Sequence, residues 1–243
     1  MSAILLLNLE APLMSFGGVA IDNRGVEMPF PAVSLITGLL ANALGYRREH
    51  FEQLQRLQDR LRLCLRIDRE GDALLDFQTA KLEKADQGWT TLGIPEGRDG
   101  GSNTYDNKHL RYRDYHADRR VTVALLLEPS EEEPTLQTLL YSLKEPQRPL
   151  YIGRKCCLPS AQIALGIVEK PTLLDALSEV KADSENARIF EAIPHGAPYQ
   201  VSEHRVSGLR QWRKQLHGGE QRWLERTQSW SNMHAHTTPK GVQ

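Results

Sequence analysis

The segment LRYRDYHADRR, residues 110–120, interleaves aromatic and cationic side chains. Its rings include Tyr112, Tyr115 and His116, and Arg113 stands between two of them. Aromatic rings can stack on the bases of single-stranded RNA while guanidinium groups hold phosphates, and each stacked base contributes about 1–3 kcal/mol. The pattern therefore predicts an RNA-binding segment. An edge strand that alternates exposed charges is the competing interpretation.

Two glycine-containing segments could cradle an anion. The first is SFGG, residues 15–18, which follows the first apolar run of the chain. Glycine lets the backbone approach an anion closely, and successive N–H groups can then form a nest around a phosphate. The second is PLYIGRK, residues 149–155, which adds Arg154 and Lys155 at the mouth of a predicted strand. The two cations favour anion binding over core packing.

The three cysteines predict no metal or redox chemistry. A structural zinc site needs four ligands, and a redox pair takes the C-x-x-C spacing. Here Cys156 and Cys157 are adjacent, and Cys64 stands alone. We therefore expect reduced, packed cysteines and neither a metal nor a cofactor.

A metal-independent ribonuclease is the enzymatic alternative. Such an enzyme could combine a His or Tyr with a Lys as its proton-transfer groups. The candidates for these roles are His109, His116, His204, Tyr112, Tyr115 and Lys155. Their spacing singles out no set, and the carboxylates form no recognisable metal motif. The residues themselves therefore identify no catalytic group.

The charge of the chain is close to balanced, at −1 over 243 residues. This balance excludes a protein that binds nucleic acid through overall charge alone. Basic residues are nevertheless concentrated in residues 98–120 and 205–226, and acidic ones at residues 128–133. Segregated patches indicate one basic face for an anion, although each run alone is equally consistent with solvated surface.

The composition is that of a soluble globular protein, with 40% hydrophobic and 25% charged residues. The longest apolar runs fall short of the roughly 18 residues that a membrane helix needs. The first run, residues 4–7, has no preceding basic residues and does not predict a signal peptide. With reduced cysteines, these features predict a cytoplasmic protein without a membrane partner.

Hydrophobic periodicity predicts an α+β fold. Apolar or alternating runs predict strands at residues 4–9, 63–68, 121–127 and 162–168. Helical spacing predicts a helix capped by Ser34 and stopped by Gly45, a second over residues 51–61, and a third over residues 136–143. The resulting order, β-α-β-β-α-β, is the ferredoxin-like plan that RNA-recognition modules also use.

Residues 1–170 are predicted to form this domain, and residues 171–243 a basic C-terminal extension. A long insert at about residues 69–120 interrupts the domain and is far longer than an ordinary connection, so we expect a functional protruding arm. The last ~10–15 residues are polar and are expected to be disordered.

Four segments in register resemble a known family. They are LLLNLEAPLMSFGG, FPAVSLITGLLANALG, LRYRDYHADRRVTVALLL and RPLYIGRKCCLPSAQIALG. Together they are similar to the CRISPR-associated protein five family of subtype I-E, a group of RAMP proteins, over roughly residues 1–170. The chain departs from the family pattern at Ala11, where glycine is usual, and at Val33, where a basic residue often precedes the serine. Arg24 could compensate for the second departure.

The resemblance implies a non-catalytic subunit with a ferredoxin-like domain and a thumb hairpin, the thumb being the long insert. Such a subunit holds the 5′ handle of CRISPR RNA in the Cascade complex, beside the backbone subunit CasC and the large subunit CasA. It meets target DNA only through the assembled complex. In subtype I-C a related member cleaves the repeat RNA, which keeps the endoribonuclease alternative open. The RNA-binding residues expected here are Ser15, Phe16, Gly17, Arg24, Ser34, Lys108, Arg111, Arg113, Tyr115, Tyr151, Arg154 and Lys155.

Overall fold

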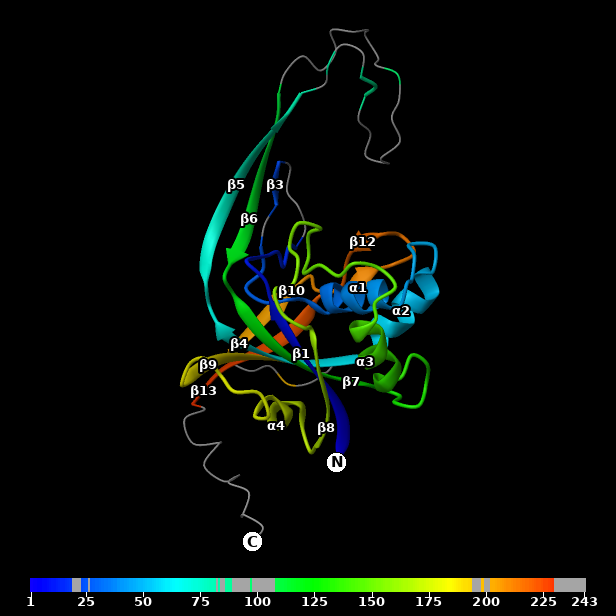
Figure 1. Ribbon diagram of the computed structural model, residues 1–243, viewed down its shortest axis with the longest axis vertical. Coiled ribbons are helices and arrows are strands. Elements are labelled where there is room, and N and C mark those ends of the chain that lie inside the picture. Colours follow the sequence, from blue (N-terminus) through cyan, green and yellow to red (C-terminus); the bar gives the residue numbers. More distant parts are fainter. Residues whose placement is uncertain are drawn as a thin grey trace.

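A seven-stranded sheet forms the centre of the molecule (Figure 1). The computed structural model describes residues 1–18, 23–25, 27–81, 83, 86–88, 97, 108–193, 198 and 202–229. Within these residues the fold is mixed α/β and consists mostly of strands. The strands lie in the order β10-β13-β9-β4-β7-β1-β8, and neighbouring strands are antiparallel. None of the described helices is long and apolar enough to cross a membrane.

The four strands predicted from the sequence lie side by side in this sheet, in the order β4-β7-β1-β8. Two helices connect β1 to β4, and one connects β7 to β8. The bounds are β1 Ser2–Glu10, α1 Val33–Ala43, α2 Phe51–Arg60, β4 Leu61–Arg69, β7 Arg120–Leu127, α3 Leu136–Lys144 and β8 Ala164–Lys170. The chain thus runs β-α-β-β-α-β through these elements, apart from short strands and the insert.

Both faces of the sheet are covered, which explains the unbroken apolar run in β1. Leu5, Leu7 and Leu9 belong to the core cluster under α1, α2 and α3. Ile4 and Leu6 point to the opposite face, where α4 (Leu173–Leu177) packs. Successive side chains of a strand alternate between faces, so a strand buried on both sides reads as continuously hydrophobic.

Helix α1 begins two residues earlier than predicted and lacks the predicted side-chain cap. Its N-cap is Ala32, which makes no side-chain cap hydrogen bond. Ser34 lies in the first turn, where its backbone N–H donates to the Gly208 carbonyl at 3.0 Å. The end of the helix follows the prediction: Gly45 adopts a φ of 81°, and the Tyr46 N–H donates back into the last turn of the helix. This is the Schellman arrangement, which favours glycine.

The C-terminal region extends the same sheet rather than packing as a separate layer. The strand β9 (Asn186–Ala192) pairs with β4, β13 (Gln221–Ser229) pairs with β9, and β10 (Glu203–Val206) forms the edge. Trp223 of β13 is fully buried in the main core. A small hairpin, β11 (Arg210–Gln211) and β12 (Leu216–His217), packs beside α2. The end expected to be disordered lies outside the described residues.

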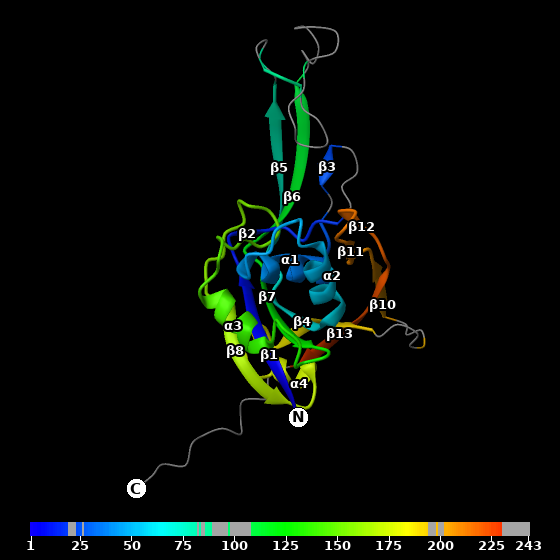
Figure 2. The same ribbon diagram turned by 90° about the vertical axis from the view of Figure 1, so that its right-hand side faces the viewer.

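The long insert contributes two paired strands that project from the body (Figures 1 and 2). They are β5 (Asp72–Ala80) and β6 (His109–Ala117), and they pair antiparallel over nine residues. Two short strands, β2 (Leu13–Met14) and β3 (Arg24–Gly25), pair with β6 near its body end and along its length. Strand β6 of the insert therefore contacts the segment that follows β1, which includes the glycine loop.

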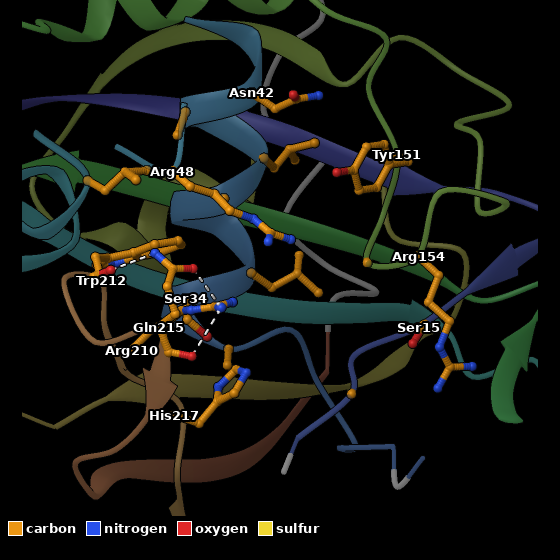
Figure 3. Close-up of a pocket in the computed structure, with 18 of the residues that line it drawn as sticks. Ser15, Ser34, Asn42, Arg48, Tyr151, Arg154, Arg210, Trp212, Gln215 and His217 are labelled. Atoms are coloured by element: carbon orange, nitrogen blue, oxygen red, sulfur yellow. Dashed lines mark hydrogen bonds between the residues drawn. The ribbon is translucent and has the colours of Figure 1, made fainter. Parts of the chain in front are cut away.

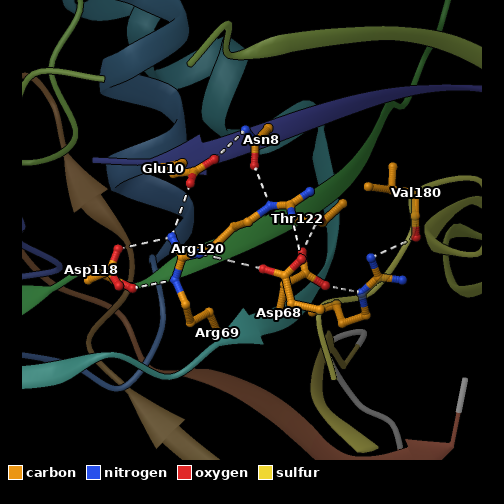
Figure 4. A network of polar contacts seen from close by, with 10 residues as sticks. Asn8, Glu10, Asp68, Arg69, Asp118, Arg120, Thr122 and Val180 are labelled. Carbon is orange, nitrogen blue, oxygen red and sulfur yellow. Dashed lines mark hydrogen bonds and ion pairs between the residues drawn. The ribbon is translucent and has the colours of Figure 1, made fainter. Parts of the chain in front are cut away.

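A buried ion pair ties the sheet to the α4 face (Figure 4). The side chains of Arg66 and Asp68 are both fully buried, with Nε and Oδ1 2.5 Å apart. Arg66 also donates to the carbonyls of Leu177 and Val180, each at 2.8 Å, and Thr122 donates to Asp68. Burial raises the pKa of Asp68 above its usual value. The cluster fixes the segment after α4 against the sheet.

Candidate nucleic-acid interface

An arginine-lined cavity of about 580 Å³ lies on the α1 side of the sheet (Figure 3). Its walls come from the loop after β1, from β3, α1 and β6, from the loop before β8, and from the β11–β12 hairpin. Six arginines line it, and none of the described lining residues is acidic: Arg47, Arg48, Arg113, Arg148, Arg154 and Arg210. On a chain with a net charge of −1, this concentration favours a locally positive surface, although Arg47 and Arg154 each pair with a glutamate just outside the lining.

The two predicted cradle segments meet at the wall of this cavity. The Ser15 N–H donates to the Ile152 carbonyl at 3.2 Å. Gly153 adopts a φ of 93°, and a Cβ there would lie 1.8 Å from the Ser15 carbonyl oxygen. A side chain at this position would be strained and would collide with backbone, so only glycine allows the two loops to touch. The sequence placed them 138 residues apart, and the fold joins them.

Arg113 and Arg154 converge over a glycine. A Cβ at Gly25 would lie 2.8 Å from Nη2 of Arg154 and 3.4 Å from Nη1 of Arg113. Gly25 belongs to β3, which pairs with β6 so that Gly25 lies opposite Arg113. The absence of a side chain at Gly25 thus leaves room for two guanidinium groups beside β6. Two adjacent guanidinium groups match the geometry of phosphate oxygens.

Arg154 is held in place by three groups. Its Nη2 donates to Oε1 of Glu27 at 3.1 Å, and its Nη1 donates to the Asp114 carbonyl at 2.9 Å. Its guanidinium carbon lies 4.6 Å from the centre of the Tyr115 ring. Burial raises the pKa of Glu27 to about 7, although hydrogen bonds from Ser15 and the Phe16 N–H oppose the shift. Arg154 is therefore orientated by a carboxyl group that titrates near neutral pH.

Two predicted contact residues have packing roles instead. The Phe16 ring is fully buried and lies 4.9 Å from the His116 ring. Tyr115 is only 4% exposed, and its hydroxyl lies 3.5 Å from Sγ of Cys156. Burial raises the pKa of that hydroxyl. Both rings turn inward, Phe16 from the loop after β2 and Tyr115 from β6, so neither is placed to stack on a base. Of the adjacent cysteines, only Cys157 is buried as predicted, whereas Cys156 is exposed.

The remaining predicted residues divide between the cavity and the surface around it. Those that line the cavity, besides Arg113 and Arg154, are Ser15, Gly17, Ser34 and Tyr151. Those that do not line it are Arg24, Lys108, Arg111 and Lys155, and all four are exposed. The side chain of Arg24 is 63% exposed and faces Asp114 with Nε 3.5 Å from Oδ2. Arg24 and Lys155 lie next in the sequence to Gly25 and Arg154, whereas Lys108 and Arg111 lie at the end of the β5–β6 pairing that is far from the body.

Four cavity arginines and one histidine were not among the predicted residues. They are Arg47, Arg48, Arg148, Arg210 and His217. Arg148 opens the segment RPLYIGRK, and its Nη2 donates to the Tyr46 carbonyl. The others come from the α1–α2 connection and from the β11–β12 hairpin, where no local motif distinguishes them from surface cations. Only the tertiary fold brings them to one cavity.

Comparison with known proteins gives consistent matches. The family model described as CRISPR-associated protein (Cas_Cas5) matches residues 4–223. The CRISPR system Cascade subunit CasD of Escherichia coli (strain K12) is 26% identical over 166 residues, which are 68% of this chain and 71% of that protein.

Solved structures show the same fold. A chain of a CRISPR RNA-guided surveillance complex superposes with a TM-score of 0.68 at 22% identity, covering 93% of this chain and 90% of that one. A Cas protein crystal structure superposes with a TM-score of 0.59 at 25% identity, covering 93% and 94%. Because the family model spans most of its length, this chain belongs to the CRISPR-associated protein (Cas_Cas5) family.

Proposed function

We propose that this protein is the non-catalytic RNA-binding subunit of a type I-E Cascade complex, in which it grips the 5′ handle of CRISPR RNA for antiviral defence. The observation that carries the proposal is the cavity with six arginines and no acidic lining residue among those described. Phosphodiester backbones carry one charge per nucleotide, and arginine side chains hold them through charge-assisted hydrogen bonds.

The RNA backbone enters beside β6 in this proposal. Arg113 and Arg154 meet there over Gly25, and the glycine leaves space for a phosphate to approach both guanidinium groups. Gly17 and Tyr151 line the same cavity. Arg24, Arg111 and Lys155 then contact flanking phosphates from the surface. Base stacking contributes less than the sequence predicted, because the Tyr115 ring is buried.

The proposed architecture is a ferredoxin-like RAMP domain with a thumb. The connectivity β-α-β-β-α-β and the sheet order β4-β7-β1-β8 support the first part. The projecting β5–β6 hairpin is the thumb in this proposal. The relative named as a Cascade subunit supports a place in that assembly, where this protein caps the filament of backbone subunits CasC and lies next to the large subunit CasA. Target DNA is met through the complex.

The absence of catalysis is part of the proposal, and the environment of the candidate proton-transfer groups supports it. His116 hydrogen-bonds to the Met28 carbonyl at 2.8 Å, and burial lowers its pKa. Tyr115 is buried with a raised pKa, and Lys155 is exposed outside the cavity lining. None of these three groups is among the residues that line the arginine cavity. The repeat-cleaving endoribonuclease is the competing hypothesis.

The proposal is tested by fluorescence anisotropy with a labelled single-stranded RNA from a type I-E repeat, titrated at several salt concentrations. Replacing Arg113 or Arg154 with Gln should raise Kd by about tenfold or more, because a charge-assisted hydrogen bond contributes about 1.5–3 kcal/mol. Each substitution should also reduce, by about 0.7, the magnitude of the slope of the logarithm of the binding constant against the logarithm of the salt concentration (the salt slope). Arg62→Gln is the matched control, since Arg62 is 47% exposed, pairs with Glu128 and lies outside the cavity.

If the Arg62 variant binds the RNA with the same Kd as the Arg113 and Arg154 variants, the proposed path for the RNA is refuted. No salt-sensitive RNA binding by the wild-type protein would contradict the proposed function itself and would favour a module that binds only proteins.

A further inference from the structure

Three basic side chains gather at the end of the cavity away from Ser15 and Arg154 (Figure 3). Arg48 reaches it from the α1–α2 connection, and Arg210 and His217 are register partners on the β11–β12 hairpin. We call this trio the distal cluster. It shares no residue with the Arg113–Arg154 pair beside β6.

The distal cluster lacks a counter-charge among the described lining residues. Nε of Arg210 is buried without a hydrogen-bond partner, while Nη2 donates to the Gln215 carbonyl and side-chain oxygens at 3.3 and 3.0 Å. Burial and then the charge of Arg48 lower the pKa of Arg210. Burial and then the charge of Arg210 lower the pKa of His217. Like charges that face one another around an unpartnered donor indicate a missing anion.

The hairpin that carries the cluster is rigidly attached to α2. Gln58 accepts the Arg210 N–H at 3.1 Å and donates to the Arg210 carbonyl at 3.0 Å. The buried Trp212 donates its indole N–H to Oε1 of the same Gln58 at 3.1 Å, and the Arg210 guanidinium lies 5.2 Å from the Trp212 ring centre. Because the Arg210 donors are held before any ligand arrives, their binding loses little conformational entropy.

We propose that the distal cluster is a subsite for one nucleotide phosphate, held by the guanidinium groups of Arg48 and Arg210 with His217 beside them. Arginine presents a planar fork of donors that matches two phosphate oxygens, and the orphaned Nε belongs to that fork. Ser34 and Gln215 line the adjoining space and offer hydrogen bonds to the attached sugar or base. If the phosphate belongs to RNA, the inference rests on the proposed function. It then extends the path of the RNA from the Arg113–Arg154 pair across α1.

Arg48→Gln is the test variant, because Arg48 is exposed and its truncation leaves the core intact. Arg210→Gln is the second variant. Arg213→Gln is the matched control: it removes the same charge from the same hairpin, but Arg213 is exposed and lies outside the cavity lining, over the Phe51 ring at 5.4 Å. The probes are inorganic phosphate, adenosine monophosphate and the labelled repeat RNA, each with the full chain.

For RNA, Arg48→Gln should raise Kd by about tenfold and reduce the salt slope by about 0.7, whereas Arg213→Gln should leave Kd within about twofold. Inorganic phosphate and adenosine monophosphate are tested by thermal unfolding. The Tm of the wild-type protein and of Arg213→Gln should be higher in either ligand than in sodium chloride of the same ionic strength. Arg48→Gln and Arg210→Gln should lose that increase, because ligand binding to the native state is what stabilises it.

The outcomes separate the two proposals. Unchanged RNA affinity in Arg48→Gln with no stabilisation by phosphate would overturn the subsite, and the proposed function would stand if the Arg113 and Arg154 variants still lose RNA. Equal losses in Arg48→Gln and Arg213→Gln would also overturn it, because only general charge would then matter. Stabilisation by phosphate that depends on Arg48, without any RNA binding, would support the anion site, assign it to a free nucleotide and refute the proposed function.

Discussion

Replacing Glu27 with Gln should remove a pH dependence of stability. The Glu27 side chain is 7% exposed, and burial raises its pKa from 4.5 to about 7. A carboxyl whose pKa is higher in the folded state binds its proton more tightly there, so its contribution to stability is complete below pH 4.5 and is lost as pH rises through 7. At about 1.4 kcal/mol per pKa unit, the full loss is about 3 kcal/mol.

The assay is urea unfolding of the wild-type protein and Glu27→Gln at matched ionic strength, between about pH 5 and pH 8. Asp68 also has a raised pKa, so the wild-type slope contains more than one group. The difference between the two proteins isolates Glu27. The free energy of unfolding of the wild-type protein should fall relative to that of the variant by about 2.5 kcal/mol across this window, because part of the full loss lies below pH 5.

A change of the opposite sign in the difference between the two unfolding free energies would refute the reasoning. If the wild-type protein gains stability relative to the variant as pH rises, the ion pair with Arg154 outweighs burial and the carboxylate is permanently charged. In the predicted case, protonation of Glu27 below about pH 7 leaves Arg154 without its counter-charge. RNA affinity should then increase as pH falls, and this increase should disappear in Glu27→Gln.

Two further substitutions test the packing of the molecule. Gly153→Ala should destabilise the protein by more than about 2 kcal/mol and weaken RNA binding, because it strains the backbone and collides with Ser15. Urea unfolding beside Gly166→Ala measures this, since Gly166 also has a positive φ but open space around it, and equal losses would contradict the collision. Arg66→Leu should cost about 3–5 kcal/mol, because Asp68 is left buried without its counter-charge. Anisotropy of the folded fraction should show unchanged RNA affinity, and a large affinity loss would place this cluster in the RNA path.

The predicted elements follow from strong local patterns. The continuous apolar run of β1 and the Gly45 stop of α1 each have a local physical cause, and the structure contains both. The predicted start of α1 was wrong, because it rested on the capping side chain of Ser34. In the structure the N-cap is Ala32, and the Ser34 N–H donates to the Gly208 carbonyl instead. That partner lies 174 residues away in the sequence. No local pattern can report such a contact.

The candidate site was predicted only in part, for a similar reason. Arg113 and Arg154 lie in distinctive segments, so pattern and resemblance both identify them. Arg48 and Arg210 are single cations in short connections, and only the fold brings them to one cavity. Tyr115 shows the opposite error, because an alternating aromatic and basic pattern does not reveal which face of β6 turns inward.

The central claim is that this protein holds RNA without cutting it. The most direct measurement incubates the purified full chain with labelled repeat RNA in EDTA and runs the product on a native gel and a denaturing gel. We expect an RNA that is shifted on the native gel and intact on the denaturing gel, with the shift weakened in Arg154→Gln. A discrete cleavage product would contradict the account and identify a metal-independent endoribonuclease.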